Sequence, residues 1–456
     1  MRLGAAVIAA VGLAALSLLL VAPAPSYDPW AWLLWGREIA HLELSTEAGP
    51  AFKPLTVAVC VLLAPLGSGV APVLWVFVAR AGAALAAVLA YALARDLAGG
   101  SRLAGTLAAA AVALTAGYLG YAASGTSEGL LVALALAAIL RARGGHHRSA
   151  LALAAGCALL RVEAWPFAAA YALWRWRRAP GEHALVAAGA VAVPALWLVP
   201  ELLGSGDLLR SGSRARTPNP GQPALADVPA WAALREAVEL ALWPMWIGLG
   251  ALALTALGRR GGSARPVLAP PADPAGRCAG ARPALALAAT GAAWIALVAL
   301  MAQAGFSGEA RYALPGVALL AVAGAVGIAA VPRPAAVALA ALLAVAAVPR
   351  IDALERVRDA QRHQWDLAAG LRRTIAASGG RDALLRCGRP YVGHLRGPLL
   401  AYHLDVAKRQ VGFVPSAPGV IFASRRTPAS PVEPSPPAGF RPIVAREGWT
   451  ISVRCA

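Results

Sequence analysis

Several charged residues stand directly beside long apolar segments of this chain, where they could move a proton or bind an anion. A carboxylate can take a proton from a hydroxyl group, and the planar guanidinium of arginine suits a phosphate. Ionisable side chains near membrane depth cost free energy and generally serve a function, so we expect these residues to share one aqueous cavity. They are Asp28, Glu128, the pair Arg161 and Glu163, and the pair Glu309 and Arg311.

Each of these residues also has a purely structural interpretation. Asp28 could cap the helix expected to begin at Pro29, because proline suits the first helical position. Glu128 could complement the dipole of the helix that follows it. Within each Arg/Glu pair, the two charges could simply neutralise each other. The residue types alone leave both interpretations open.

One lysine and several aromatic residues are further candidates. Lys53 is one of only two lysines in the chain and could contact a phosphate. Trp30, Trp32 and Trp35 could stack on a sugar, but tryptophans next to an apolar segment more often belong to the aromatic belt at the membrane interface. Tyr312 is expected as an interfacial anchor.

The composition indicates a multi-pass membrane protein. Of 456 residues, 59% are hydrophobic and 14% are charged, whereas soluble domains are about 45–50% apolar. The net charge of +18 is carried mostly by arginines in short loops between apolar segments. Such loops tend to stay in the cytoplasm. We therefore expect this basic chain to have the lipid bilayer, and no nucleic acid, as a partner.

The apolar segments predict a helical membrane domain over residues 1–349 with about eleven transmembrane helices. Arg2 precedes the first segment and places the N-terminus in the cytoplasm. The next loop, 26–66, is then outside, and its short apolar end, bracketed by prolines, favours helices that lie on the interface. A Pro/Gly/Arg-rich stretch, 258–283, predicts a cytoplasmic linker.

Two parts of the chain outside the apolar segments are distinctive. The polar segment 204–229 is long for a connection and is typical of a lid or binding loop. Residues 350–456 begin with helical periodicity and continue with strand-like pieces such as GVIFAS and WTISVRC, which predicts a small extracytoplasmic α/β domain. In an oxidising compartment, Cys387 and Cys455 of this domain can form a disulfide.

An ordered set of motifs resembles the GT-C glycosyltransferase superfamily. The set consists of the acid after the first span, then KPLTVAVCVLLAPLG, SGTSEGL, LLRVEAWPF and GEARYALP. The resemblance covers roughly the whole membrane region. The chain departs from the superfamily pattern in two respects: Glu128 stands where many members have Asp, and no second acid adjoins Asp28.

The resemblance implies an inverting hexosyl- or pentosyltransferase of the cell (inner) membrane. It would move a sugar from a polyprenyl-phosphate donor to an extracytoplasmic acceptor, which could be a glycan, a lipid or a protein. Asp28 would be the base or the acceptor-orienting group, assisted by Glu128. The donor phosphate would contact Arg161, Arg311 and Lys53, with Glu163, Glu309, Tyr312 and Trp30 in support.

Two questions stay open at this stage. If a divalent cation such as Mg²⁺ or Mn²⁺ takes part, Asp28 and Glu128 are its expected ligands, because two carboxylates without histidine form a hard-cation site. The alternative function is a transporter or flippase for a lipid or a polar solute, which predicts charged residues at mid-membrane and repeated halves.

Overall fold

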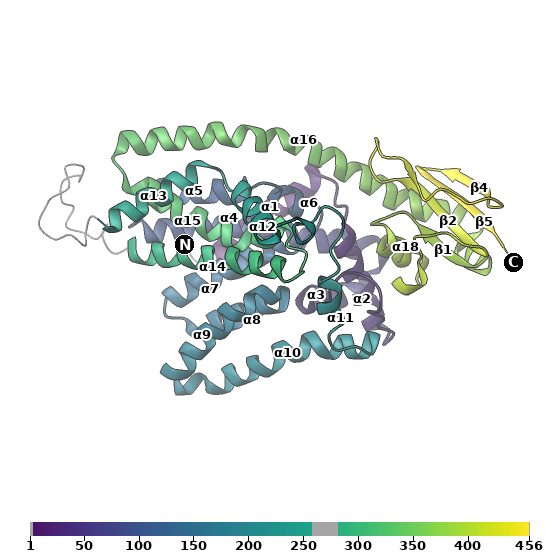
Figure 1. Ribbon diagram of the computed structural model, residues 1–456, viewed down its shortest axis with the longest axis horizontal. Helices are drawn as coiled ribbons and strands as arrows, with labels where there is room; N and C mark the ends of the chain where they lie inside the picture. Colours follow the sequence, from purple (N-terminus) through teal and green to yellow (C-terminus); the bar gives the residue numbers. More distant parts are fainter. Residues whose placement is uncertain (1–2, 258–280, 456) are drawn as a thin grey trace, which may run out of the picture.

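The chain forms a bundle of helices that one long helix connects to a small β-sheet (Figure 1). The computed structural model describes residues 3–257 and 281–455. The first part contains helices α1 (Leu3–Leu20), α2 (Tyr27–Ala40), α3 (Pro54–Leu63), α4 (Gly67–Leu97), α5 (Arg102–Ala113), α6 (Tyr118–Ala123), α7 (Glu128–Arg143), α8 (His147–Leu160), α9 (Trp165–Arg178), α10 (His183–Ser205), α11 (Arg210–Ala215), α12 (Pro229–Leu240) and α13 (Pro244–Leu257). The second part contains α14 (Ala281–Gln303), α15 (Leu314–Ala330), α16 (Arg333–Ala377), α17 (Gly380–Arg386) and α18 (Gly397–Leu404). Its strands are β1 (Arg389–Val392), β2 (Gly419–Arg425), β3 (Val432–Glu433), β4 (Arg441–Arg446) and β5 (Trp449–Arg454).

The described helices are those of a multi-pass membrane protein. Six helical segments are long and apolar enough to cross a bilayer, and a seventh is obtained if α12 and α13, bent by 94°, count as one span. The predicted number of about eleven spans is therefore not confirmed. Several predicted spans correspond to helices of only 12 to 16 residues, namely α5, α7, α8 and α9. Hydropathy alone does not show where such a segment breaks. Most of the predicted linker 258–283 lies outside the described residues.

Helix α15 lies at the centre of the bundle. All of its residues from Leu314 to Ile328 are buried. Gly327 approaches the backbone of Gly248 on α13 so closely that a Cβ at either position would collide with the partner helix. Small residues let membrane helices pack at such short distances. This tight packing holds α15 against α13, and Arg311 lies in the 3₁₀ turn Ala310–Ala313 that directly precedes α15.

The loop after α1 folds into the two helices α2 and α3. Gly36 of α2 lies against α3, where an added Cβ would be 2.6 Å from the carbonyl carbon of Cys60. Asp28 stands in the first turn of α2, and Lys53 immediately precedes α3, which begins at Pro54. Close packing of α2 against α3 therefore fixes the position of Asp28 relative to Lys53. The interfacial position of these helices stays a prediction.

The last apolar helix of the bundle extends into the C-terminal domain. Helix α16 runs unbroken from Arg333 to Ala377 and passes through the domain boundary expected at residue 350. In Figure 1 it extends along the helical bundle and ends beside the sheet. The strand order is β1-β2-β5-β4, with β3 paired to β2. β1 and β2 are parallel and the other pairs are antiparallel.

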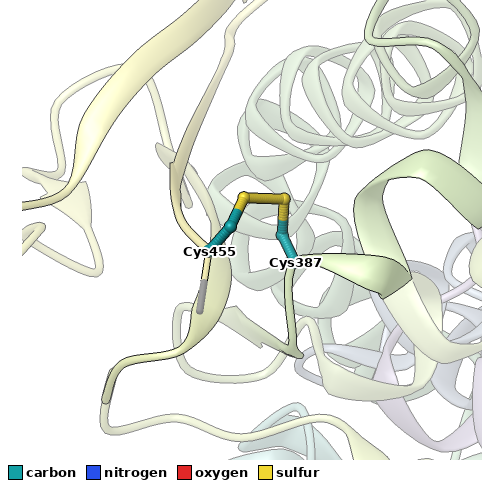
Figure 2. Close-up of a disulfide and its surroundings, with 2 residues drawn as sticks. All are labelled: Cys387 and Cys455. Carbon is teal, nitrogen blue, oxygen red and sulfur yellow. A yellow bond between two sulfur atoms is a disulfide. The ribbon is translucent and has the colours of Figure 1, made fainter.

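A disulfide closes the C-terminal domain. It joins Cys387, which follows α17, to Cys455, which follows β5 (Figure 2). The two cysteines are 68 residues apart in sequence, so the bond ties the end of the chain back to the start of the sheet. The other two cysteines in the described part, Cys60 and Cys157, are free and buried.

The C-terminal domain is docked on α2 through an aromatic contact. The ring centroids of Trp30 and Tyr402, which belongs to α18, are 5.3 Å apart. Trp32 and Trp35 are completely buried. The expectation that these tryptophans form an interfacial belt is therefore wrong, because protein rather than lipid headgroups covers them. Helix α2 therefore packs against both the helical bundle and the C-terminal domain.

Candidate active site

All but one of the charged residues predicted from the sequence line one cavity of about 870 Å³. The residues that line it come from the start of α2, the break between α8 and α9, the segment after α10, the loop before α15, and the C-terminal domain. Predicted residues in the lining are Asp28, Lys53, Arg161, Glu163, Glu309, Arg311 and Tyr312. Trp30 is not in the lining, and it packs against α18 instead.

Arg311 is the central cation of this site. Its Nη2 donates to Asp28 Oδ2 at 3.1 Å, although the two residues are 283 positions apart in the sequence. Its Nε donates to Glu309, and its Nη1 lies 3.8 Å from Glu128 Oε1. The side chains of Arg311 and Asp28 are each 15% exposed. The carboxylate of Asp28 is therefore held in place by an arginine and still reaches the cavity.

Arg161 is held by a carboxylate two residues away. The chain is extended at Arg161, between α8 and the short 3₁₀ turn Val162–Ala164. Its Nε and Nη2 donate to Oε2 and Oε1 of Glu163, at 3.1 and 2.5 Å. The guanidinium also stacks over the ring of Tyr312 at 3.5 Å from the centroid. Because Nε and Nη2 already donate to Glu163, we expect Arg161 to act on the site mainly through its positive charge.

Glu128 lies beneath the cavity rather than in it. Its side chain is 1% exposed, and its Oε1 is 3.7 Å from Arg161, 3.8 Å from Arg311 and 3.9 Å from Lys53. Burial by itself would raise the pKa of Glu128, but the three cations outweigh burial and hold that pKa at about 2. Glu128 is thus a permanent anion that gathers the three cations. In this geometry it acts as a positioning residue.

Lys53 keeps spare hydrogen-bond donors at the helical side of the cavity. Its Nζ donates to Ser127 Oγ at 3.3 Å and lies 5.0 Å from the centre of the Trp32 ring. Burial lowers its pKa to about 8, although Glu128 acts in the opposite direction. An ammonium has three donors, so Lys53 can bind an anion from the cavity without breaking an existing pair.

The carboxylates do not offer a set of metal ligands in the described residues. No group of three or more His, Cys, Asp or Glu there is placed to hold a metal ion. Arg311 contacts both Asp28 and Glu128, the two expected ligands. A guanidinium in that place fits a divalent cation poorly because the charges repel. The expectation of Mg²⁺ or Mn²⁺ stays a prediction.

The segment after α10 contributes residues that the charge pattern did not identify. Ser211 of this segment lines the cavity and donates to Glu201 of α10, a completely buried carboxylate that also pairs with Arg210 at 3.5 Å. Gln222 donates to Glu309 at 2.5 Å, which supports the carboxylate beside Arg311. The polar composition of segment 204–229 was the signal for Arg210, Ser211 and Gln222. It predicted a binding loop without showing which side chains turn inward.

The C-terminal domain also supplies part of the lining, which no sequence motif indicated. Arg396, His394 and Arg426 belong to it. They lie in an ordinary α/β sequence, and only the docking of the domain on α2 brings them to the cavity.

Comparison with known proteins identifies the fold. The sequence matches no known family profile. No curated protein sequence matches it. The structure is similar to that of ArnT from Cupriavidus metallidurans, which was crystallised bound to undecaprenyl phosphate, with a TM-score of 0.55 over 99% of this chain and 97% of that chain. Sequence identity between the two is 13%, so the similarity concerns the fold alone: the described part of this chain adopts an ArnT-like fold.

Proposed function

We propose that the chain is a GT-C-type membrane glycosyltransferase that takes a sugar from a polyprenyl-phosphate donor. The observation that carries this proposal is the pairing of Asp28 with Arg311 at a cavity that also holds Lys53. It combines a group that can accept a proton with groups that can stabilise a phosphate, in a protein of membrane-spanning helices. The ArnT-like fold supports the proposal, since that neighbour binds a polyprenyl phosphate.

The proposed reaction is a single displacement at the anomeric carbon. The acceptor hydroxyl loses its proton to Asp28 as its oxygen attacks that carbon. The bond between the carbon and the phosphate oxygen breaks, and its electron pair stays on the phosphate. Lys53 and Arg311 stabilise the charge that develops there. Attack opposite the leaving group inverts the configuration at the anomeric carbon, and a hexose or a pentose could be the sugar transferred.

The cavity is proposed to face the extracytoplasmic side. The disulfide between Cys387 and Cys455 belongs to the domain that lines the cavity, and disulfides persist in oxidising compartments. The acceptor, a glycan, lipid or protein, would then enter from outside, while the N-terminus stays in the cytoplasm of a cell whose inner membrane holds the protein.

The test is transfer by the purified full-length protein in detergent. Radiolabelled polyprenyl-phosphate sugars are offered with a panel of hydroxyl acceptors, and the expected result is labelled product with release of polyprenyl phosphate. The same protein in liposomes tests the transporter alternative. Movement of an intact polyprenyl-phosphate sugar between leaflets, with no cleavage of the sugar–phosphate bond in either assay, would overturn the proposal.

Binding of the donor should weaken as the pH rises through about 8, because Lys53 loses its charge there. The ammonium that contacts phosphate predominates below that pH. The phosphodiester of the donor does not titrate in this range, so we expect a loss of about tenfold in affinity when this one charged contact is removed. Binding of labelled donor across this pH range measures the effect. Lys53→Arg keeps its charge and should remove the dependence; the same dependence in that variant would assign it to another group.

A further inference from the structure

The wall of the cavity formed by the C-terminal domain differs in charge from the wall formed by the helices. On the helical side, Arg311 and Arg161 already donate to carboxylates, and Lys53 lies near Glu128. On the domain side, Arg396 and Arg426 line the same cavity.

Arg396 is a buried arginine whose hydrogen-bonding capacity is largely unused. It is 3% exposed and precedes α18. Its Nη1 donates to Ser424, whereas its Nε and Nη2 have no hydrogen-bond partner among the described residues. The nearest carboxylate, Glu433, is 3.9 Å from Nη2 and is 46% exposed. A buried guanidinium with free donors is costly unless an anion satisfies it.

Arg426 adds a second positive charge to this wall. Its backbone carbonyl accepts a hydrogen bond from Gln364 Nε2 at 2.7 Å, which ties the loop after β2 to α16. His394 lines the cavity beside Arg396. Three residues of one domain with nitrogen-bearing side chains thus line a cavity whose helical side holds Asp28 paired with Arg311.

We propose that Arg396 and Arg426 bind an anionic group, a phosphate or a carboxylate, on the sugar acceptor. This inference rests on the proposed glycosyl transfer. The donor is a lipid that approaches between helices, and the cations at the helix ends bind its phosphate. The domain belongs to the aqueous side, so the molecule that it contacts is the acceptor. An anion held by Arg396 would orient the acceptor so that its hydroxyl faces Asp28.

Three methyl hexosides that differ only at C6 test the proposal, with a carboxylate, a phosphate or a hydroxyl at that position. The full-length protein should use at least one anionic hexoside with a lower KM than the neutral one. In Arg396→Gln, the KM for that hexoside should rise about tenfold, as expected for one charged hydrogen bond, while the KM for the neutral hexoside and for the donor stays the same. The better of the two anionic hexosides identifies the group. Equal effects on charged and neutral hexosides would overturn the inference.

Direct binding separates this inference from the proposed function. Calorimetric titration with the two anionic hexosides in the absence of donor should show binding to the wild type and about tenfold weaker binding to Arg396→Gln. Arg426→Gln changes an exposed residue, so it keeps the test valid if the Arg396 variant does not fold. Binding without any transfer would contradict the transferase but not the anion site. Absence of binding to the folded wild type would overturn the anion site even if transfer occurs.

Discussion

Replacement of Asp28 by Asn should lower the rate of sugar transfer by a factor of about 10²–10⁴, the usual contribution of a general base. Asn keeps the size of the side chain but cannot take up the proton of the acceptor hydroxyl. The side chain would still contact Arg311 Nη2, which lies 3.1 Å from Asp28 Oδ2 in the wild type. The donor should therefore still bind. Single-turnover transfer and donor binding, measured on the same folded protein, give the two quantities.

Glu309→Gln is the matched control for this experiment. Glu309 is a second carboxylate that accepts from Arg311 and lines the same cavity. Its replacement removes one charged partner of Arg311 and leaves Asp28 in place, so a smaller fall of about tenfold is expected. Equal falls in the two variants would show that both carboxylates merely position Arg311. Unchanged transfer in Asp28→Asn would remove Asp28 from the chemistry.

Replacement of Glu128 by Gln should destabilise the protein by about 3 kcal/mol, because it leaves buried cations without their common anion. Oε1 of Glu128 lies within 3.9 Å of nitrogens of Lys53, Arg161 and Arg311. Glu128 also raises the pKa of Lys53. In Glu128→Gln that pKa should fall below about 8, so donor binding should be lost at a lower pH than in the wild type.

Thermal unfolding in detergent and the pH profile of donor binding test these two effects. Glu128→Asp keeps the charge and serves as the control: it should destabilise less and leave the pH profile close to that of the wild type. A pH profile that does not move in Glu128→Gln would contradict the role of Glu128 as the anion that sets the charge of Lys53. Normal stability of that variant would show that the three cations find other partners.

Much of the candidate site could be predicted from local sequence because its residues stand at the ends of apolar segments. Asp28 at the start of α2, Lys53 before α3 and Arg311 before α15 all follow this rule. Side chains at helix ends project into the same layer of a helical membrane protein, so their gathering in one cavity follows from hydropathy and charge. The number of spans could not be predicted in this way, because apolar helices of 12 to 16 residues such as α5 and α7 give the same hydropathy signal as longer helices.

The amino-acid sequence by itself determined that this is a membrane protein. It also identified most of the acids and arginines that lie together at the site, and the two C-terminal cysteines that can pair. These properties depend on composition and on neighbours in the chain. Only the tertiary structure decided the role of each residue. Three neighbouring cations hold Glu128 as an anion beneath the cavity, and Glu163 accepts from Nε and Nη2 of Arg161. Docking of the C-terminal domain on α2 buried Trp30 and brought Arg396 to the cavity. Burial and pairing depend on residues far apart in the chain, and a linear pattern does not contain those distances.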